Sequence, residues 1–357
     1  MVEFFNIDRS FDLHVTAPPR IDIGGGITDL PEFSKVVGTK IFNIAIDVYE
    51  DVRCKNALKI EVTTTPNNRD EPRLFVNNTP IHLESESANF NLPREVFLRL
   101  LASSNKIPSL DVKISNPFPD KTGLGCSAVI TLCLARALLH ERGGGERTYT
   151  VTRAHNLETK KLGIRGGFQD YIAAYFGGYN YIDFPSLSET LIESKTLGLK
   201  APRSIEDDLN KSMVIVVRKQ GSRSSSEILD DQANSLLTNR KKTIELLNGM
   251  QSHNEKIFKK FFQKGSSLKE IGAHVNDSWK LQKQLQAFSQ PGVLKDIEKS
   301  VQSSVYGLRG LGSGNNSLLL LIKPGSKKDV LRYLQSLNDS ALLLYGKVNS
   351  VGLQAES

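Results

Sequence analysis

Two things are scarce in this chain: cysteine and long apolar stretches. It has three cysteines in 357 residues, Cys54, Cys126 and Cys133, and they form no C-x-x-C pair. Their odd number and wide spacing argue against a disulfide framework or a zinc site and favour a reducing compartment. No stretch approaches the ~20 apolar residues of a membrane helix. Charged residues interrupt the first 16 residues, which argues against a signal peptide. We therefore expect a cytoplasmic protein without a membrane partner.

Dense blocks of basic residues are also missing, although the net charge is positive. The chain has 46 Lys and Arg against 39 Asp and Glu, which gives a net charge of +7. Such an excess is compatible with an anionic substrate, with nucleic acid, or simply with a solvated basic surface. Because no Lys/Arg block carries interleaved aromatic residues, the solvated surface is favoured and nucleic acid is not expected as a partner.

Short apolar runs separated by turns fill the first part of the chain. Four segments have the composition or alternation of strands: residues 41–48, 58–62, 73–76 and 110–114. Turns are predicted between them at residues 65–68 and 77–80. Two helices are predicted at residues 94–102 and 127–140, and the second is apolar nearly all round, which indicates a buried helix.

The composition changes at residues 183–204, where Ser, Thr and Pro rise and periodicity fades. We expect a boundary there that divides the chain into residues 1–195 and 196–357. Further predicted elements of the second part are a strand at 213–217, a largely helical stretch at 226–283, an apolar run at 318–322, a helix at 328–337 and an apolar run at 341–345. The pattern predicts the α+β class, with two domains and a cleft between them.

The central motif is P-x-x-x-G-L-G-x-S-A, from Pro119 to Ala128, between a predicted strand and the predicted buried helix. Glycines let a backbone approach a ligand closely, and free N–H groups at a helix start bind anions. A lone G-x-G is more often a turn, but the longer string favours phosphate binding, and it lacks the Gly-Lys ending of a Walker loop. The expected nucleotide-binding residues are Lys121, Gly123, Leu124, Gly125, Cys126 and Ser127.

Two further glycine clusters lie far away in the sequence, at residues 17–29 and 307–314. Each alone could be a tight turn, Arg20 a surface ion pair and Asp29 a cap. Two carboxylates, Glu158 and Asp170, complete the set. Phosphoryl transfer needs oxygen ligands for magnesium and a group that orients or deprotonates the attacking hydroxyl. Spacing alone does not separate these roles from two solvated surface carboxylates.

The order of A-P-x-R, P-x-x-x-G-L-G-x-S-A and a late G-x-G cluster resembles the GHMP small-molecule kinases, over most of the chain. Within that family the sequence is most similar to kinases of an anomeric hydroxyl, the D-glycero-D-manno-heptose 7-phosphate kinases and the L-fucokinases. The segments that carry this likeness are residues 24–31, 166–170, 173–180 and 222–229.

The resemblance implies the two-domain GHMP kinase fold, with the active site in the interdomain cleft, and the cofactors ATP and Mg²⁺. It implies that Asp170 takes or orients the acceptor proton, that Arg20 stabilises charge, and that Ser127 and Glu158 bind magnesium. The γ-phosphoryl group would go to a sugar or sugar-phosphate hydroxyl, most plausibly the anomeric hydroxyl of a heptose 7-phosphate or a similar sugar. The residues that would contact the substrate are Gly25, Gly26, Thr28, Asp29, Gly167, Gln169, Arg223, Gly312 and Gly314.

Four positions depart from the family pattern. Cys126 replaces the first serine of the loop, and Arg309 stands where lysine is common. Asn315 and Asn316 replace glycines of the third cluster, and asparagine tolerates the left-handed conformations that such a turn would need. These departures keep an alternative open, a catalytically impaired protein of the same fold that senses a ligand or regulates. A small sugar or sugar phosphate is the expected partner, and a homodimer is left open.

Overall fold

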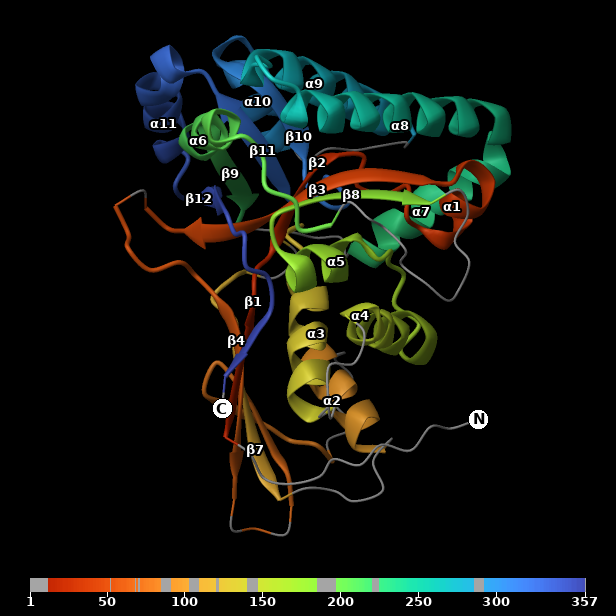
Figure 1. The fold of residues 1–357 in the computed structure, drawn as a ribbon, viewed down its shortest axis with the longest axis vertical. Coiled ribbons are helices and arrows are strands. Elements are labelled where there is room, and N and C mark those ends of the chain that lie inside the picture. Colours follow the sequence, from red (N-terminus) through yellow and green to blue (C-terminus); the bar gives the residue numbers. More distant parts are fainter. Residues whose placement is uncertain are drawn as a thin grey trace.

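The computed structural model describes residues 12–51, 53–67, 69, 71–84, 91–102, 109–119, 122–139, 147–184, 197–219, 225–285 and 292–356. Within this part the chain forms two β-sheets covered by helices, an α+β architecture as the sequence predicts (Figure 1). One sheet and its helices form the lower part of the molecule in Figure 1, and the other sheet forms the upper part.

The lower sheet has six strands in the order β13-β1-β4-β7-β5-β6. Their bounds are β13 Gln354–Glu356, β1 Leu13–Ala17, β4 Ile60–Pro66, β7 Leu110–Ser115, β5 Arg73–Val76 and β6 Thr79–Ile81. All pairs are antiparallel except β5 with β7. Along β7, buried and more exposed residues alternate, which is the period-two pattern of a sheet with one covered face. Helices α2 (Leu92–Ala102) and α3 (Cys126–Leu138) cover that face, and α4 (Arg147–Asn156) packs against α3 (Figure 1).

The upper sheet has seven strands, with β8 pairing to β3 beside the order β10-β11-β9-β12-β3-β2. Their bounds are β10 Val305–Gly310, β11 Ser317–Ile322, β9 Met213–Arg218, β12 Ala341–Val348, β3 Thr39–Tyr49, β2 Arg20–Gly24 and β8 Tyr179–Phe184. The apolar runs of β9 and β11 are buried throughout, because alternate residues enter two different hydrophobic clusters. Covered faces on both sides explain why these strands read as continuous apolar runs.

Helices pack on this sheet and connect it to the lower half (Figure 1). The upper helices are α6 Arg203–Ser212, α8 Arg240–Phe262, α9 Leu268–Gln284, α10 Gly292–Val301 and α11 Lys327–Gln335, with 3₁₀ turns at Gln302–Ser304 and Pro324–Ser326. A third cluster, centred on the fully buried Phe33, joins α1 (Pro31–Val37) and α7 (Ser225–Thr238) to α8. Helix α5 (Gln169–Phe176) lies between the two halves, after a π-helical turn at Leu157–Lys161.

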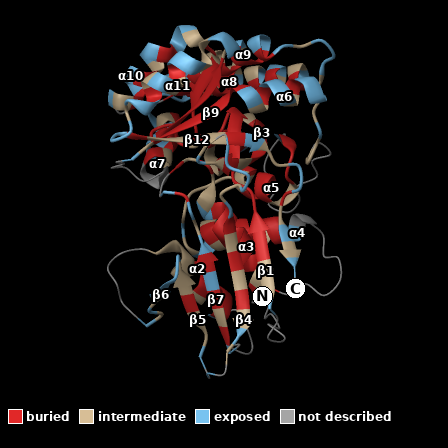
Figure 2. Cartoon of the chain, turned by 90° about the vertical axis from the view of Figure 1, so that its left-hand side faces the viewer, coloured by how far each residue is buried: buried red, intermediate tan, exposed pale blue. Residues whose placement is uncertain are grey.

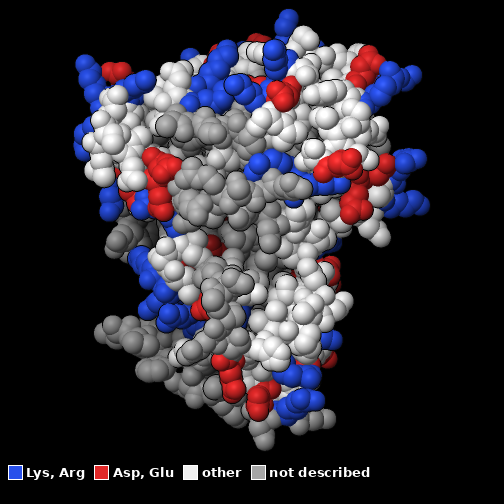
Figure 3. Space-filling model, turned by 180° about the vertical axis from the view of Figure 1, so that it is seen from behind, with Lys and Arg blue, Asp and Glu red and all other residues white. Residues whose placement is uncertain are grey.

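Buried residues concentrate along the strands and on the inner faces of the helices, while the outer helix faces are exposed (Figure 2). On the face seen in Figure 3, basic and acidic side chains are interspersed rather than gathered in one block. Among the described helices, none is both long enough and apolar enough to cross a membrane. All three cysteines are free.

Most of the predicted elements are present within a few residues of their predicted bounds. The predicted strands at 41–48, 58–62, 73–76, 110–114 and 213–217 are β3, β4, β5, β7 and β9, and the apolar runs at 318–322 and 341–345 are β11 and β12. The predicted helices at 94–102, 127–140 and 328–337 are α2, α3 and α11, and the helical stretch at 226–283 is α7, α8 and α9. The expected division between residues 195 and 196 lies outside the described residues and stays a prediction.

Both predicted turns were placed too broadly. Thr65 and Pro66 pair with β7 at the end of β4, a strand end being a position where a missing proline N–H is tolerated. In the segment 77–80, only Asn77 and Asn78 turn, with φ of 49° and 65°, and Thr79 begins the edge strand β6. Two consecutive left-handed residues match the twist of a tight hairpin, and asparagine is suited to them.

Candidate active site

The loop at residues 123–127 leads into α3 and has the backbone of an anion site. Gly123 and Gly125 adopt φ of 72° and 78°, a region that glycine enters with little strain. A Cβ on Gly123 would lie 2.6 Å from the carbonyl oxygen of Leu311, so space as well as φ requires glycine there. Gly125 precedes α3 without a side-chain cap, and Ser127 in the first turn is exposed. The first N–H groups of α3 are therefore available to an anion.

Leu124 and Cys126 anchor the underside of this loop. Leu124 is fully buried, and its carbonyl accepts a 3.0 Å hydrogen bond from the backbone N–H of Arg20. The Cys126 Sγ lies 3.5 Å from the Thr122 hydroxyl. Burial raises the pKa of Cys126 to about 11, so this side chain is a neutral thiol at physiological pH.

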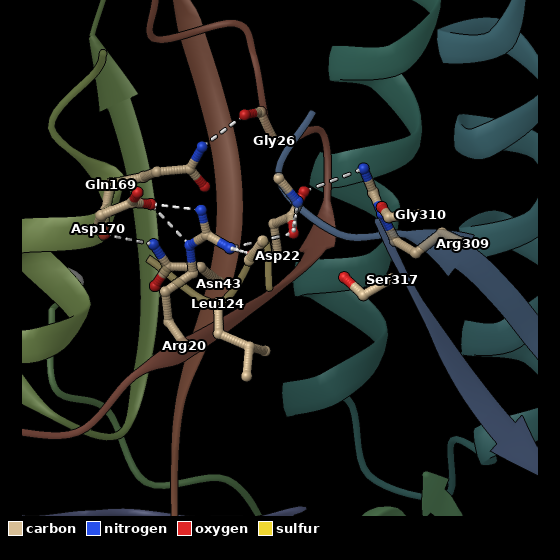
Figure 4. A network of polar contacts seen from close by, with 12 residues as sticks. Arg20, Asp22, Gly26, Asn43, Leu124, Gln169, Asp170, Arg309, Gly310 and Ser317 are labelled. Carbon is tan, nitrogen blue, oxygen red and sulfur yellow. Dashed lines mark hydrogen bonds and ion pairs between the residues drawn. The ribbon is translucent and has the colours of Figure 1, made fainter. Parts of the chain in front are cut away.

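Arg20, on β2, connects the loop to Asp170 at the start of α5 (Figure 4). Its Nε and Nη2 both lie 2.6 Å from Oδ1 of Asp170, and its Nη1 donates to the Gly123 carbonyl at 2.5 Å. The Arg20 side chain is 4% exposed and that of Asp170 is 24% exposed. The second carboxylate oxygen, Oδ2, lies toward Gly125, 3.3 Å from where a Cβ would stand. Asp170 thus faces the start of α3.

Glu158 is buried in the π-helical turn that follows α4, a rare conformation that is frequent at functional sites. The Thr131 hydroxyl of α3 donates to its Oε1. Thr131 is one turn beyond Ser127, so Glu158 lies on the same face of α3 as Ser127. Burial raises the pKa of Glu158 to about 7, against the effect of hydrogen bonds from Thr131 and Tyr171. The nearby charge of Asp170 adds to the rise.

The loop after β2 is tied to the start of α5. Gln169 donates from Nε2 to the Gly26 carbonyl at 2.5 Å and from its backbone N–H to Asp29 Oδ2 at 3.0 Å. A Cβ on Gly167 would lie 2.0 Å from the Asp29 carboxyl carbon. Burial raises the pKa of Asp29 to about 7, opposed by the Gln169 hydrogen bond. Thr28 is fully buried, so the protein contacts of Thr28 and Asp29 hold this loop in shape.

Asn254 of α8 contacts the same loop at Gly25. Its Nδ2 donates to the Lys40 carbonyl at 2.6 Å. That nitrogen would be 1.7 Å from a Cβ on Gly25, so helix α8 and the loop approach each other too closely for any side chain there.

The third glycine cluster reaches the site through a buried ion pair. Its first half is strand β10, in which Arg309 is fully buried and lies 3.2 Å from Oδ2 of the equally buried Asp22. Gln282 Oε1 accepts a second bond from Arg309 at 2.7 Å. The backbone N–H of Gly312 donates to the other Asp22 oxygen at 3.1 Å, and a Cβ on Gly312 would lie 3.0 Å from the Gly123 Cα.

Asn315 and Asn316 complete the turn between β10 and β11. Within the described residues, positive φ outside glycine occurs only at Asn77 and Asn78. Asn315 and Asn316 therefore do not use the left-handed region. Both are buried, and Asn316 Oδ1 accepts from Arg218 Nη2 at 3.2 Å. The Gly314 N–H closes the turn onto the Leu311 carbonyl at 2.9 Å.

The structure therefore brings three distant glycine clusters to one place, at the junction of the two sheets (Figures 1 and 4). Arg20, Asp170, Glu158 and the first turn of α3 surround one region. Glu158 is buried and Asp170 pairs with Arg20, so neither carboxylate is a solvated surface group. Of the sequence-predicted site residues, Lys121 and Arg223 lie outside the described residues.

Comparisons with known proteins agree with this geometry. Residues 91–178 match the model of the GHMP kinases N terminal domain, a segment that holds the loop, Glu158 and Asp170. Over this segment the chain is similar to the N-terminal domain of the GHMP kinases. Its fold matches a solved sugar-phosphate kinase structure over nearly its full length.

Three similar proteins show how distant the likeness is. The chain is 20% identical to D-glycero-alpha-D-manno-heptose 7-phosphate kinase of Campylobacter jejuni, over 90% of this chain and 93% of that one. It is 22% identical to the bifunctional fucokinase/GDP-fucose pyrophosphorylase of Arabidopsis thaliana, over 90% of its own length but only 31% of that protein. The crystal structure of a D-glycero-D-manno-heptose 1-phosphate kinase from Bacteriodes thetaiotaomicron matches with a TM-score of 0.72 and 21% identity, covering 97% of this chain and 99% of that one.

Several residues of this candidate site escaped the sequence reasoning. Asp22 stood inside the first glycine cluster, and Ile21 and Ile23 alternate with Arg20 and Asp22 as in a strand, which was an available signal for β2. Gln282 and Asn254 carried no signal, because a buried polar residue on a helix is indistinguishable in sequence from an exposed one.

Proposed function

We propose that this chain is an ATP- and Mg²⁺-dependent sugar kinase. It transfers the γ-phosphoryl group to a hydroxyl of a sugar or sugar phosphate, and the anomeric hydroxyl of a heptose 7-phosphate or a similar sugar is our first choice. The observation that carries the proposal is the Arg20–Asp170 pair, held against the uncapped start of α3. The heptose kinase relatives support the choice of acceptor. A cytoplasmic location belongs to the same proposal.

The nucleotide phosphates would lie at the first turn of α3. The N–H groups there, the helix dipole and the loop from Gly123 to Ser127 form a fixed anion site. Lys121, two residues before the loop, is proposed as an added positive charge. Cys126 takes part through its backbone N–H, so its thiol needs no role.

The residues present fit a magnesium ion. Magnesium prefers oxygen ligands in octahedral geometry and retains several waters. Ser127 offers an exposed hydroxyl and Glu158 a carboxylate on the same face of α3. The raised pKa of Glu158 reports a buried negative charge with too little compensation, which a cation supplies. When bound, magnesium neutralises phosphate charge and orients the triphosphate.

Asp170 is proposed as the group that receives the acceptor proton. Arg20 binds one of its oxygens with two donors, and the other oxygen lies toward the start of α3. The acceptor hydroxyl would approach between Oδ2 and the γ-phosphorus. Its oxygen forms a bond to phosphorus while the bond to the β-phosphate oxygen breaks, ADP leaves, and the proton passes to Asp170. The Arg20 guanidinium offsets negative charge on the transferring group.

The remaining predicted residues are proposed to shape the acceptor side. They are Gly25, Gly26, Thr28, Asp29, Gly167, Gln169, Gly312, Gly314 and Arg223. Four of them are glycines at which a Cβ would meet Asn254, Asp22, Asp29 or Gly123, so their proposed role is to place backbone close to the substrate. Arg223 is proposed as a bidentate partner for a sugar phosphate.

A coupled assay of ADP release tests this proposal. Heptose 7-phosphates, fucose, galactose and related sugars are supplied with ATP and Mg²⁺, beside an Asp170→Ala control. We expect turnover with at least one sugar, and loss of it in the control. Turnover that persists unchanged in the control, or no turnover with any acceptor, contradicts the proposal.

The buried Asn315 and Asn316 favour one alternative, a protein of this fold that binds ligands without transferring phosphate. It predicts that ATP or a sugar raises the unfolding temperature while no ADP forms over hours. The same samples serve for both measurements.

A further inference from the structure

A cluster of metal-ligating side chains lies outside the proposed active site, between the two long helices of the upper half. His253 is on α8, and His274 and Asp277 are on α9. One ligand atom from each of the three lies within 4.8 Å of the other two. The two imidazoles face each other through their Nδ1 atoms, 3.3 Å apart. All three residues are half-buried, so an ion from solvent can reach them.

The helix pair fixes this arrangement. His274 and Asp277 are three residues apart on α9, so they lie on one face of the helix. That face meets α8, with which α9 packs along its length (Figure 1). The three ligands therefore come from two rigid elements and not from a loop, which limits their motion.

The spacing of the two nitrogens matches a tetrahedral metal site. Zinc binds imidazole nitrogen at about 2.0–2.1 Å, and tetrahedral geometry then separates two nitrogen ligands by about 3.3–3.4 Å. The observed Nδ1–Nδ1 distance of 3.3 Å equals this edge length, so the two nitrogens already have the separation that one ion requires. Two imidazoles and one carboxylate are also the donor set that zinc and its neighbours prefer, whereas magnesium takes oxygen ligands.

We propose that His253, His274 and Asp277 bind one divalent transition-metal ion of the zinc class, with water as the fourth ligand. The ion joins α8 to α9. Two features oppose it: Asp277 already pairs with Lys280 at 3.0 Å, and Lys256 lies near both histidines. The Asp277–Lys280 pair is exposed and three residues apart on one helix, so it is weak and yields its oxygen to a metal at little cost.

The proposed metal site lies next to residues that contact the loop at Gly25. Asn254 and Ser278 directly follow His253 and Asp277 and turn inward, where the Ser278 hydroxyl donates to Asn254 Oδ1 at 3.3 Å. Asn254 in turn lies against Gly25 and donates to the Lys40 carbonyl. Metal binding thus fixes the two helices immediately behind the loop that approaches the acceptor.

The test is a titration of metal-free, tag-free full-length protein with Co²⁺, followed by its visible absorption, and with Zn²⁺ by calorimetry. A buffer with excess Mg²⁺ saturates the separate oxygen site proposed at Ser127 and Glu158. No ATP or sugar is needed, so the result does not depend on kinase activity.

We expect one ion per chain and a visible spectrum of tetrahedral cobalt. His253→Gln and His274→Gln should each weaken binding at least tenfold, and Asp277→Asn should weaken it less. The control is His82→Gln, which changes an exposed histidine elsewhere and should bind as the parent does. Unfolding temperatures in a chelator should be equal for all variants, and Zn²⁺ should raise them in the parent and the control but not in the two histidine variants.

Two results would overturn the proposal. One is the absence of stoichiometric binding at metal concentrations of about 100 μM, which is far above the dissociation constants typical of zinc sites. The other is binding that His253→Gln and His274→Gln leave unchanged, which would place the ion elsewhere and leave the two rings as a hydrogen-bonded pair.

Discussion

Arg20 contacts two aspartates, Asp22 and Asp170, which differ in their burial and in their other partners. Asp22 is fully buried, contacts a second arginine, Arg309, and accepts a backbone N–H from Gly312. Asp170 contacts Arg20 through one oxygen (Figure 4). Its side chain is 24% exposed, and its other oxygen lies toward Gly125. A carboxylate with both oxygens occupied holds structure together. A carboxylate with one oxygen to which no described residue donates, and with partial access to solvent, is available for proton transfer.

The largest expected effect is on catalysis, at the exposed end of this comparison. Asp170→Asn keeps the shape but removes the proton acceptor, and we expect kcat to fall by about 10²–10⁴-fold. The urea midpoint should change little, because Arg20 keeps Asp22 and the Gly123 carbonyl as partners. Initial rates with the preferred sugar from the acceptor screen measure this. Asp207→Asn, an exposed carboxylate on α6, is the control. A stability loss as large as the activity loss would assign Asp170 to structure.

The next effect is on stability, at the buried end. Asp22→Asn leaves the fully buried Arg309 without its counter-charge, and breaking such a pair costs about 3–5 kcal/mol. Urea unfolding measures the loss. Asp51→Asn breaks an exposed pair with Arg53, which has the same two-residue spacing as Asp22 and Arg20, and there we expect almost no change. Equal effects of the two substitutions would refute the distinction between buried and exposed partners.

The third and smaller expected effect is a pH dependence of stability that comes from Glu158. Its pKa is raised from 4.5 to about 7, so between these values the folded chain binds more protons than the unfolded chain. Stability therefore falls as pH rises from 4.5 to 7, by up to about 3 kcal/mol from this group. Asp29, raised in the same direction, adds to the fall.

Glu158→Gln should remove the part of that fall that belongs to Glu158 and make the protein more stable than the parent at pH 8 in a chelator. Urea midpoints at pH 5 and pH 8 measure it. Addition of Mg²⁺ should stabilise the parent at pH 8 and leave the variant unchanged. A parent whose stability rises over this pH range contradicts the buried, uncompensated carboxylate.

Much of the fold was predictable, and the reason is visible in particular strands. In β9 and β11 the side chains alone are apolar enough to specify a strand buried on both faces. β2 and β10 were missed as strands because they carry Arg20, Asp22 and Arg309 among glycines. Their charges are tolerated only because residues almost 290 positions apart neutralise one another, and this pairing exists only in the folded chain.

The sequence predicted which residues belong to the candidate site better than it predicted the contacts of those residues. The loop, Arg20, Glu158 and Asp170 were singled out by motif, and the structure brings them together. The resemblance implied that Thr28 and Asp29 contact the substrate, which stays a prediction, and sequence reasoning did not foresee that both are buried. It also gave no means to find Asn254 or Gln282, since their burial depends on how α8 and α9 pack on the sheet.

Strand β3 pairs with β2 and β8 at one end and, at Tyr49, with Tyr345 of β12. About 300 residues must leave the ribosome before that last pairing can form. At a synthesis rate of about 5–20 residues per second, the upper sheet waits some 15–60 seconds with an open edge beside β3. A nascent chain of this protein should therefore depend on chaperones that shield strand edges, and slowing translation should lengthen the period in which it is prone to aggregate.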